Sequence, residues 1–143
     1  MKFWDHSAIL PLVVKEKTTS TALTAYRNDS EVVVWWATEI ECFSALARLS
    51  RESMLEENEL TIAIERLTAL AQSWYVVQPT DRLRHVACRM LRVHPLRAAD
   101  AQQLAAAMLA SEMQPSTMPM YCLDHRLAIA ARKEGFSVGA MDP

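Results

Sequence analysis

The sequence predicts an α/β fold of three layers, in which a parallel sheet of about four or five strands lies between helices. Short runs of β-branched and aromatic residues, typical of buried strands, alternate along the chain with longer segments of helical spacing. Strands that are separated by helices pair in parallel and are covered on both faces. The length of 143 residues, of which 51% are hydrophobic and 22% charged, predicts a single domain over residues 1–143.

The expected strands are short and mostly apolar. They cover residues 2–4, 32–36, 74–77, 120–123 and 136–138. The clearest is the second, Val-Val-Val-Trp-Trp, because β-branched and aromatic side chains favour a pleated, buried surface. Pro79 closes the third run, because proline has no N–H group for the next hydrogen bond of a strand ladder.

The expected helices carry apolar residues at intervals of three and four. They cover residues 7–14, 18–27, 38–51, 56–73, a segment between Thr80 and Pro95, and residues 97–111 and 124–134. Thr80 is a favourable N-cap, and Gly135 is expected to end the last helix. In the helix 38–51 the spacing predicts one side formed by Ile40, Phe43, Leu46, Ala47 and Ser50, and it places Glu41 on a different stripe.

The composition excludes several kinds of site. Gly135 and Gly139 are the only glycines, so the chain has neither a P-loop nor a dinucleotide-binding fingerprint. Three cysteines, Cys42, Cys88 and Cys122, are odd in number and far apart, which fits neither a zinc site nor a disulfide framework. We expect them to be small buried apolar side chains in a reducing compartment.

The charge distribution is uneven, although the formal net charge is only −2. Residues 81–133 contain eight basic and four acidic side chains. These basic residues are either solvated helix faces or part of a surface for nucleic acid, and the sequence leaves both alternatives open. With no visible signal peptide and no run approaching about 20 apolar residues, we expect a cytoplasmic protein without a membrane partner.

Four carboxylates occupy similar places in the pattern of strands and helices. Asp5 follows the first strand, Glu41 lies in the opening turns of a helix after the second strand, Asp100 interrupts an alanine-rich helix, and Asp124 opens the last helix. The carboxyl ends of parallel strands and the helix starts beyond them meet along one edge of the sheet, where ligands bind. Four carboxylates at that edge predict a site for Mg²⁺ or Mn²⁺.

Each carboxylate also has a simpler structural role. Asp5 and Asp124 are suited to cap helices, Glu41 can lie on a solvated face, and Asp100 can pair with Arg97. Asp124 can cap a helix and still turn one oxygen toward a metal ion. The four histidines match no metal-ligand spacing, so they are expected at the surface or near substrate. Without an arranged imidazole or thiolate, zinc is expected to substitute poorly.

Four segments taken together resemble a known family. They are residues 3–8, 37–49, 96–107 and 123–136, and the last two carry Leu-Arg-x-x-Asp-Ala and Asp-x-Arg-Leu followed by Ala-Ala-x-x-Glu-Gly-Phe. In order and content they resemble the acidic blocks of PIN-domain endoribonucleases, and more narrowly the VapC-type toxins of toxin–antitoxin modules. The resemblance covers essentially the whole chain. It implies a three-layer PIN-like domain with a parallel sheet flanked by helices.

The resemblance also implies the site and the partners. Asp5, Glu41, Asp100 and Asp124 would form the metal site, with Ser7 as a hydroxyl beside it, and the enzyme would cleave RNA with Mg²⁺ or Mn²⁺ and be inhibited by a bound antitoxin. The chain departs from the family in two places. His6 stands where a small residue is expected, and residues 121–123 contain no Ser or Thr near the acid.

The chemistry of such ligands favours hydrolysis by metal-activated water, with Asp5, Glu41 and Asp100 as the main ligands and Asp124 as an outer one. Two alternatives stay open: a non-catalytic α/β protein-interaction module, and a nuclease directed at DNA. For partners we expect an apolar groove that accepts an antitoxin helix, and a homodimer. The groove candidates are Ile9, Leu10, Leu12, Leu23, Tyr26, Leu49, Met54, Leu55 and Leu60.

Overall fold

A parallel sheet of four strands forms the centre of the molecule. The computed structural model describes residues 1–140. Its strands are β1 (Lys2–Trp4), β2 (Val32–Trp35), β3 (Tyr75–Val77) and β4 (Met120–Tyr121), in the order β3-β2-β1-β4. All three pairings are parallel, as the alternation of strands and helices predicts.

The fifth expected strand, at residues 136–138, is reduced to a single parallel bridge between Met120 and Val138. Its neighbour β4 has only two residues, so little of the edge is available for pairing. Gly135 adopts a φ of +103° immediately before this segment, which ends the preceding helix as predicted.

Within residues 1–140, seven α-helices connect and cover the strands. They are α1 (His6–Val13), α2 (Thr19–Asn28), α3 (Thr38–Arg51), α4 (Glu57–Ala71), α5 (Asp81–Val93), α6 (Ala98–Ala110) and α7 (His125–Lys133), and a short 3-10 turn, η1 (Pro115–Thr117), precedes β4. The bounds lie within two residues of those expected from periodicity. Among the described residues no helix is both long and apolar enough to cross a membrane.

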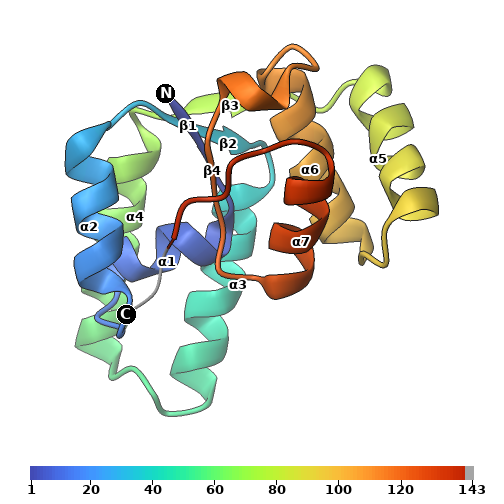
Figure 1. Ribbon diagram of the computed structural model, residues 1–143. Coiled ribbons are helices and arrows are strands. Elements are labelled where there is room, and N and C mark those ends of the chain that lie inside the picture. The colour runs from blue at the N-terminus through green and yellow to red at the C-terminus, as the bar shows by residue number, and fades with distance from the viewer. Residues whose placement is uncertain (141–143) are drawn as a thin grey trace.

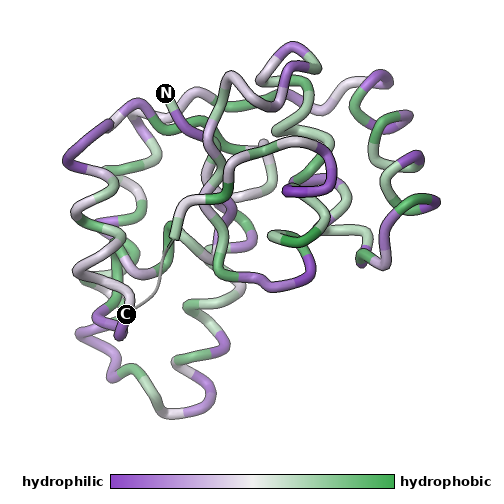
Figure 2. Tube along the Cα trace, viewed as in Figure 1, coloured by the Kyte–Doolittle hydropathy of each residue, from purple (hydrophilic) through white to green (hydrophobic). Residues whose placement is uncertain are grey.

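The sheet divides the hydrophobic core into two clusters, which makes the fold three-layered. Side chains alternate across a strand, so Phe3 and Trp4, both fully buried, face opposite sides. Phe3 belongs to the cluster formed with α5, α6 and α7, whereas Trp4 packs with α1 to α4. In Figure 1, α5 lies outermost on its side, beyond α6. Figure 2 shows hydrophobic and hydrophilic segments alternating along α5, as expected for a helix with one face in solvent.

Helix α6 is the most deeply buried of the helices. Ala101, Ala105, Ala106 and Ala107 are fully buried between the sheet and the neighbouring helices. Small side chains allow this close approach, and they leave little space for a polar group that has no partner. The position of this helix therefore controls how its polar residues meet the sheet edge.

Three sequence predictions about burial are wrong. On α3, Ile40 is 58% and Phe43 37% exposed, whereas Leu46, expected on the same side, is buried together with Cys42. Apolar residues occur all round α3, so periodicity does not single out one face, and the small Cys42 fits the side that packs against α1. Cys88 is exposed because α5 turns Ala87 inward instead. Ile9 is fully buried and cannot line a groove.

Candidate metal centre

The fold brings the four predicted carboxylates to one edge of the sheet. Asp5 directly follows β1, and Glu41 lies in the first turn of α3, which follows β2. Asp100 lies in the first turn of α6, and Asp124 is the N-cap of α7 after β4. Because the strands are parallel, their carboxyl ends and these helix starts lie on the same side.

Hydrogen bonds from Ser7 hold the carboxylate of Asp5 in place. It is 1% exposed and caps α1, where its Oδ2 accepts hydrogen bonds from the Ser7 backbone N–H at 3.1 Å and the Ser7 hydroxyl at 2.5 Å. The Ser7 Oγ in turn accepts a hydrogen bond from the Leu123 N–H at 2.8 Å. Ser7 therefore links the carboxylate after β1 to the segment after β4.

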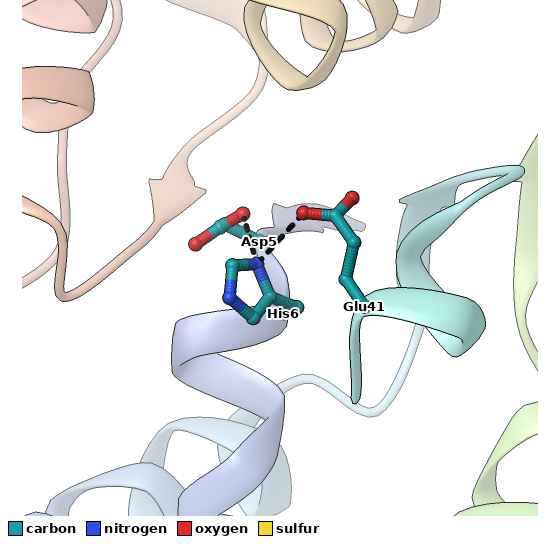
Figure 3. A group of neighbouring side chains, drawn as sticks. All are labelled: Asp5, His6 and Glu41. Atoms are coloured by element: carbon teal, nitrogen blue, oxygen red, sulfur yellow. Dashed lines mark hydrogen bonds and ion pairs between the residues drawn. The ribbon is translucent and has the colours of Figure 1, made fainter. Parts of the chain in front are cut away.

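His6 faces two carboxylates at once, as Figure 3 shows. Its Nδ1 lies 3.1 Å from Asp5 Oδ1 and 3.1 Å from Glu41 Oε2. Burial alone would lower the pKa of His6, but hydrogen bonds and the negative charges of Asp5 and Glu41 outweigh burial and raise this pKa to about 10. The sequence-based expectation that no imidazole is arranged near the carboxylates is wrong.

The same contacts act on Asp5 in the opposite sense. Burial raises the pKa of the Asp5 carboxyl, but the hydrogen bond and charge of His6, together with the bonds from Ser7, bring this pKa below its usual value. Asp5 is therefore ionised at neutral pH.

Glu41 is oriented by a buried polar pair that the sequence analysis did not identify. Gln103 Nε2 donates to Glu41 Oε1 at 2.9 Å and to Thr38 Oγ1 at 3.1 Å, and both Gln103 and Thr38 are fully buried. The spacing of Gln103 and Thr38 along the sequence could have identified both as site residues. Gln103 lies three residues after Asp100 and Thr38 three residues before Glu41, so each shares a helix face with a predicted site residue.

The negative charges of the other carboxylates act on the ionisation of Asp100. Its pKa is raised by partial burial and by the charges of Asp124 and Asp5, against a weaker opposing hydrogen bond from the Arg97 backbone. No ion pair joins its side chain to Arg97 within residues 1–140, so the simpler role proposed for Asp100 is wrong. The negative charges at this edge thus repel one another in the absence of a cation.

Asp124 has the capping role that the sequence predicts. Its Oδ1 accepts a hydrogen bond from the Leu127 N–H at 2.8 Å, and the side chain is exposed. Asp100 and Asp124 lie outside the compact group in which ligand atoms of Asp5, His6 and Glu41 all come within 4.8 Å of one another. The edge therefore has an inner group of three ligands and two more carboxylates around it.

The donor set fits a divalent metal ion. Two carboxylates and one imidazole nitrogen converge from the start of α1 and the first turn of α3, and each carboxylate has its second oxygen held by a protein hydrogen bond. The nearby cysteines do not compete, because burial and the charges of Asp5 and Asp124 raise the pKa of Cys122 to about 12. Burial also raises the pKa of Cys42, so both side chains are neutral thiols at pH 7.

Comparisons with known proteins show the fold. The sequence matches no protein-family model, and it matches no curated protein. Among solved structures, it is similar to FitAcB from Neisseria gonorrhoeae, with a TM-score of 0.68 and 15% identity over 99% of this chain and 98% of that chain. The fold is PIN-like.

Two further solved structures agree with this PIN-like fold. PAE2754 from Pyrobaculum aerophilum has a TM-score of 0.64 and 17% identity over 96% of this chain and 81% of that chain. FitAB bound to an IR36 DNA fragment has a TM-score of 0.66 and 17% identity over 99% of this chain and 95% of that chain. At such identities the likeness concerns the fold, and function has to be argued from the residues of this chain.

Proposed function

We propose that this protein is a metal-dependent endoribonuclease and the toxin of a type II toxin–antitoxin system. One observation carries the proposal: a PIN-like fold gathers Asp5, Glu41, Asp100 and Asp124 at one edge of the sheet, where burial and the charges of the neighbouring carboxylates raise the pKa of Asp100. Mg²⁺ or Mn²⁺ would relieve the repulsion between these charges and suits oxygen ligands.

In this mechanism the protein's own residues bind and orient. Asp5 and Glu41 would hold the ion, with Asp100 beside them and Asp124 as an outer ligand. Ser7 fixes one oxygen of Asp5, and Gln103 fixes one oxygen of Glu41, so neither carboxylate has to be ordered when the ion binds. A divalent ion makes water more acidic and stabilises negative charge on the leaving oxygen of a phosphodiester.

The surface charge supports a polyanionic substrate. The eight basic side chains of residues 81–133 are all exposed, and they are Arg82, Arg84, Arg89, Arg92, Arg97, Arg126, Arg132 and Lys133. Ion pairs with Asp81 and Glu134 engage Arg84 and Arg89. The remaining basic residues are available to neutralise phosphates of an RNA strand that approaches the acidic edge.

Exposed apolar side chains support the proposed protein partners. Leu12, Leu23, Tyr26, Arg66, Ala69 and Leu70 line a hollow of about 320 Å³ on the layer formed by α1, α2 and α4. This groove has the apolar character that accepts an amphipathic helix, here that of a cognate antitoxin. Trp36, Ile40 and Phe43 form a second exposed patch, which we assign to a homodimer. We assign the protein, its two proposed partners and the RNA substrate to the cytoplasm.

Cleavage assays with matched RNA and DNA strands test the proposal. RNA cleavage should require Mg²⁺ or Mn²⁺ and stop in EDTA, and Asp5→Asn, Glu41→Gln and Asp100→Asn should each remove most of it. Asp124→Asn should be milder, because asparagine still caps a helix. The exposed Asp81, outside the edge, gives a control variant, Asp81→Asn.

The alternatives predict other results. Cleavage of the DNA strand alone would identify a DNA-directed nuclease. No cleavage, together with no change of melting temperature on adding Mn²⁺, would identify a non-catalytic interaction module. Undiminished cleavage in EDTA would contradict a metal mechanism altogether.

A further inference from the structure

His6 is the feature of the acidic edge that an all-oxygen metal site does not explain. It is the first residue of α1, directly after the capping Asp5, and a side chain at a helix start can readily turn to solvent. Instead, only 30% of the side chain is exposed, and the ring is turned toward Asp5 and Glu41. The imidazole therefore occupies the space between two proposed metal ligands.

The two carboxylates present matching oxygens to this ring. Asp5 Oδ2 is bonded to Ser7, which leaves Oδ1 directed at His6 Nδ1. Glu41 Oε1 is bonded to Gln103, which leaves Oε2 directed at the same nitrogen. Each carboxylate thus has one oxygen fixed by the protein and the other directed to a common point.

The distances from Nδ1 to the two carboxylate oxygens fit those between neighbouring ligands of one ion. Both distances from Nδ1 to the carboxylate oxygens are 3.1 Å. Neighbouring ligands of a six-coordinate ion with bonds of about 2.1 Å lie about 3 Å apart. Nδ1 carries at most one hydrogen, so it cannot donate a separate hydrogen bond to each carboxylate. Figure 3 shows the other ring nitrogen on the far side of the ring from both carboxylates, where it has no hydrogen-bond partner among the described residues.

We propose that metal binding releases the Nδ1 proton of His6 to solvent and that Nδ1 then coordinates the ion, which makes the site prefer a first-row transition ion such as Mn²⁺ over Mg²⁺. The inference rests on the proposed function, since it places the ion at the same edge. Mg²⁺ is bound almost entirely by oxygen, whereas imidazole binds first-row transition ions well. An Asp-His-Glu set is therefore more selective than carboxylates alone.

Pulsed electron paramagnetic resonance of the full chain with Mn²⁺ tests the coordination directly. The wild-type protein should show hyperfine coupling of Mn²⁺ to a directly bound ¹⁴N nucleus. Labelling the histidines with ¹⁵N should convert that signal to the ¹⁵N pattern, and this measurement needs no variant. Binding of Mn²⁺ without any nitrogen coupling would overturn the proposal and leave the oxygen-ligand site of the proposed function intact.

Two variants assign the nitrogen and the selectivity. His6→Asn should abolish the coupling and lower the ratio of Mn²⁺ to Mg²⁺ affinity by at least about tenfold, as loss of a ligand or of its support typically does. His125→Asn, which removes the exposed imidazole next to Asp124, should change neither quantity. Coupling that persists in His6→Asn and disappears in His125→Asn would overturn the assignment. Absence of any Mn²⁺ binding by the wild-type protein would overturn both the inference and the proposed function.

Discussion

Asp5 and Asp100 lie at the same edge, but their surroundings act on ionisation in opposite directions. Burial disfavours the charged form of Asp5, yet His6 and Ser7 outweigh it and lower the pKa. For Asp100, partial burial and the charges of Asp124 and Asp5 raise the pKa. The ionised form of Asp5 therefore stabilises the metal-free fold above pH 3.8, and that stability is lost as the pH falls. The ionised form of Asp100 destabilises the fold at neutral pH.

The two asparagine variants should accordingly differ in stability. At pH 7 in EDTA, Asp5→Asn should lower the free energy of unfolding by about 1–3 kcal/mol, because it weakens a buried hydrogen-bonded network. Asp100→Asn should be as stable as the wild-type protein or slightly more stable, because it removes a repelled charge. Urea denaturation measures both, with Asp81→Asn as the exposed control. A clear loss of stability in Asp100→Asn would show that its charge is compensated in the fold.

His6 makes a prediction about pH in the metal-free protein. Its pKa is about 10 in the folded state and ordinarily 6.5, so protonated His6 contributes stability that is complete below pH 6.5 and lost as the pH rises through 10. The free energy of unfolding in EDTA should decline between these values, and the decline should be smaller in His6→Gln. His125→Gln should keep the wild-type decline. Equal slopes for the His6→Gln variant and the wild-type protein would contradict the ion-pair arrangement.

The sequence predicts the carboxylates of the edge better than the residues that support them. Asp5, Glu41, Asp100 and Asp124 follow from position alone, because strand ends and helix starts must meet at one edge. The roles of His6 and Gln103 depend on side-chain direction and on how closely α6 approaches α3, and neither is encoded in a local pattern. The expectation that the histidines lie at the surface or near substrate is wrong for His94, which is buried away from the acidic edge with its Nε2 2.6 Å from Glu134 Oε1.

At the scale of elements, the contact between α6 and α3 sets the position of Glu41. Gln103 on α6 reaches Glu41 and Thr38 on α3, so these polar contacts connect the two layers at the edge of the sheet. Replacing a buried amide by an apolar side chain of the same shape changes the free energy of unfolding little. Loss of the orientation of a metal ligand, in contrast, lowers the affinity for the metal. Gln103 is therefore a positioning residue.

Gln103→Met should separate positioning from stability. The substitution keeps the length of the side chain but removes both donated hydrogen bonds, so Glu41 becomes free to turn away. We expect affinity for Mn²⁺ to fall about tenfold while the melting temperature in EDTA changes by only a few degrees. Isothermal titration with Mn²⁺ measures the affinity. The neighbouring Gln102, which is less buried, gives the control Gln102→Met. Unchanged affinity for Mn²⁺ in Gln103→Met would show that Gln103 does not position Glu41.

Element type is well predicted from the sequence, and element orientation is not. The bounds of α3 are those expected from spacing, yet its inward face is not, because apolar residues surround the helix and packing selects Cys42 and Ala45. The spacing of apolar residues identifies the buried face of a helix only when the opposite face is polar. On α5 the spacing places Leu83, Val86, Ala87, Met90 and Leu91 inward. Of these, Leu83, Ala87 and Met90 are buried, whereas Leu91 is 42% exposed.

At the scale of the whole molecule, the order of strands determines which carboxylates meet. Strand β1 lies between β2 and β4, so its end is adjacent to segments that follow it by about 30 and 120 residues in the sequence. The Asp5 N–H donates to the Tyr121 carbonyl at 2.9 Å, which directly connects the first and last parts of the chain. Sequence pattern predicts a parallel sheet, but the order follows from crossovers that only the folded chain shows.

The two layers also divide the molecular surface between different proposed partners. The layer with α5, α6 and α7 carries the eight exposed basic residues of the segment 81–133, whereas the layer with α1, α2 and α4 carries the groove at Leu12, Leu23 and Tyr26, with the exposed Arg66 at its lining. The acidic edge adjoins both layers, because Asp5 caps α1 and Asp100 lies in the first turn of α6. An antitoxin seated in the groove can therefore reach the edge without covering the basic surface.

This arrangement predicts that antitoxin binding and nuclease activity can be separated by mutation. Co-expression with the product of an adjacent small gene should give a stable complex with suppressed nuclease activity. Leu23→Lys places a charge in the apolar groove and should abolish co-purification while RNA cleavage persists. Thr24→Lys, at the exposed next position of α2, should retain the complex. Melting temperatures of both variants establish that they are folded.

Loss of the complex in both variants, or in neither, would contradict the groove as the docking surface. A wild-type protein that purifies alone as a monomer and is tolerated on overproduction would contradict the toxin proposal itself.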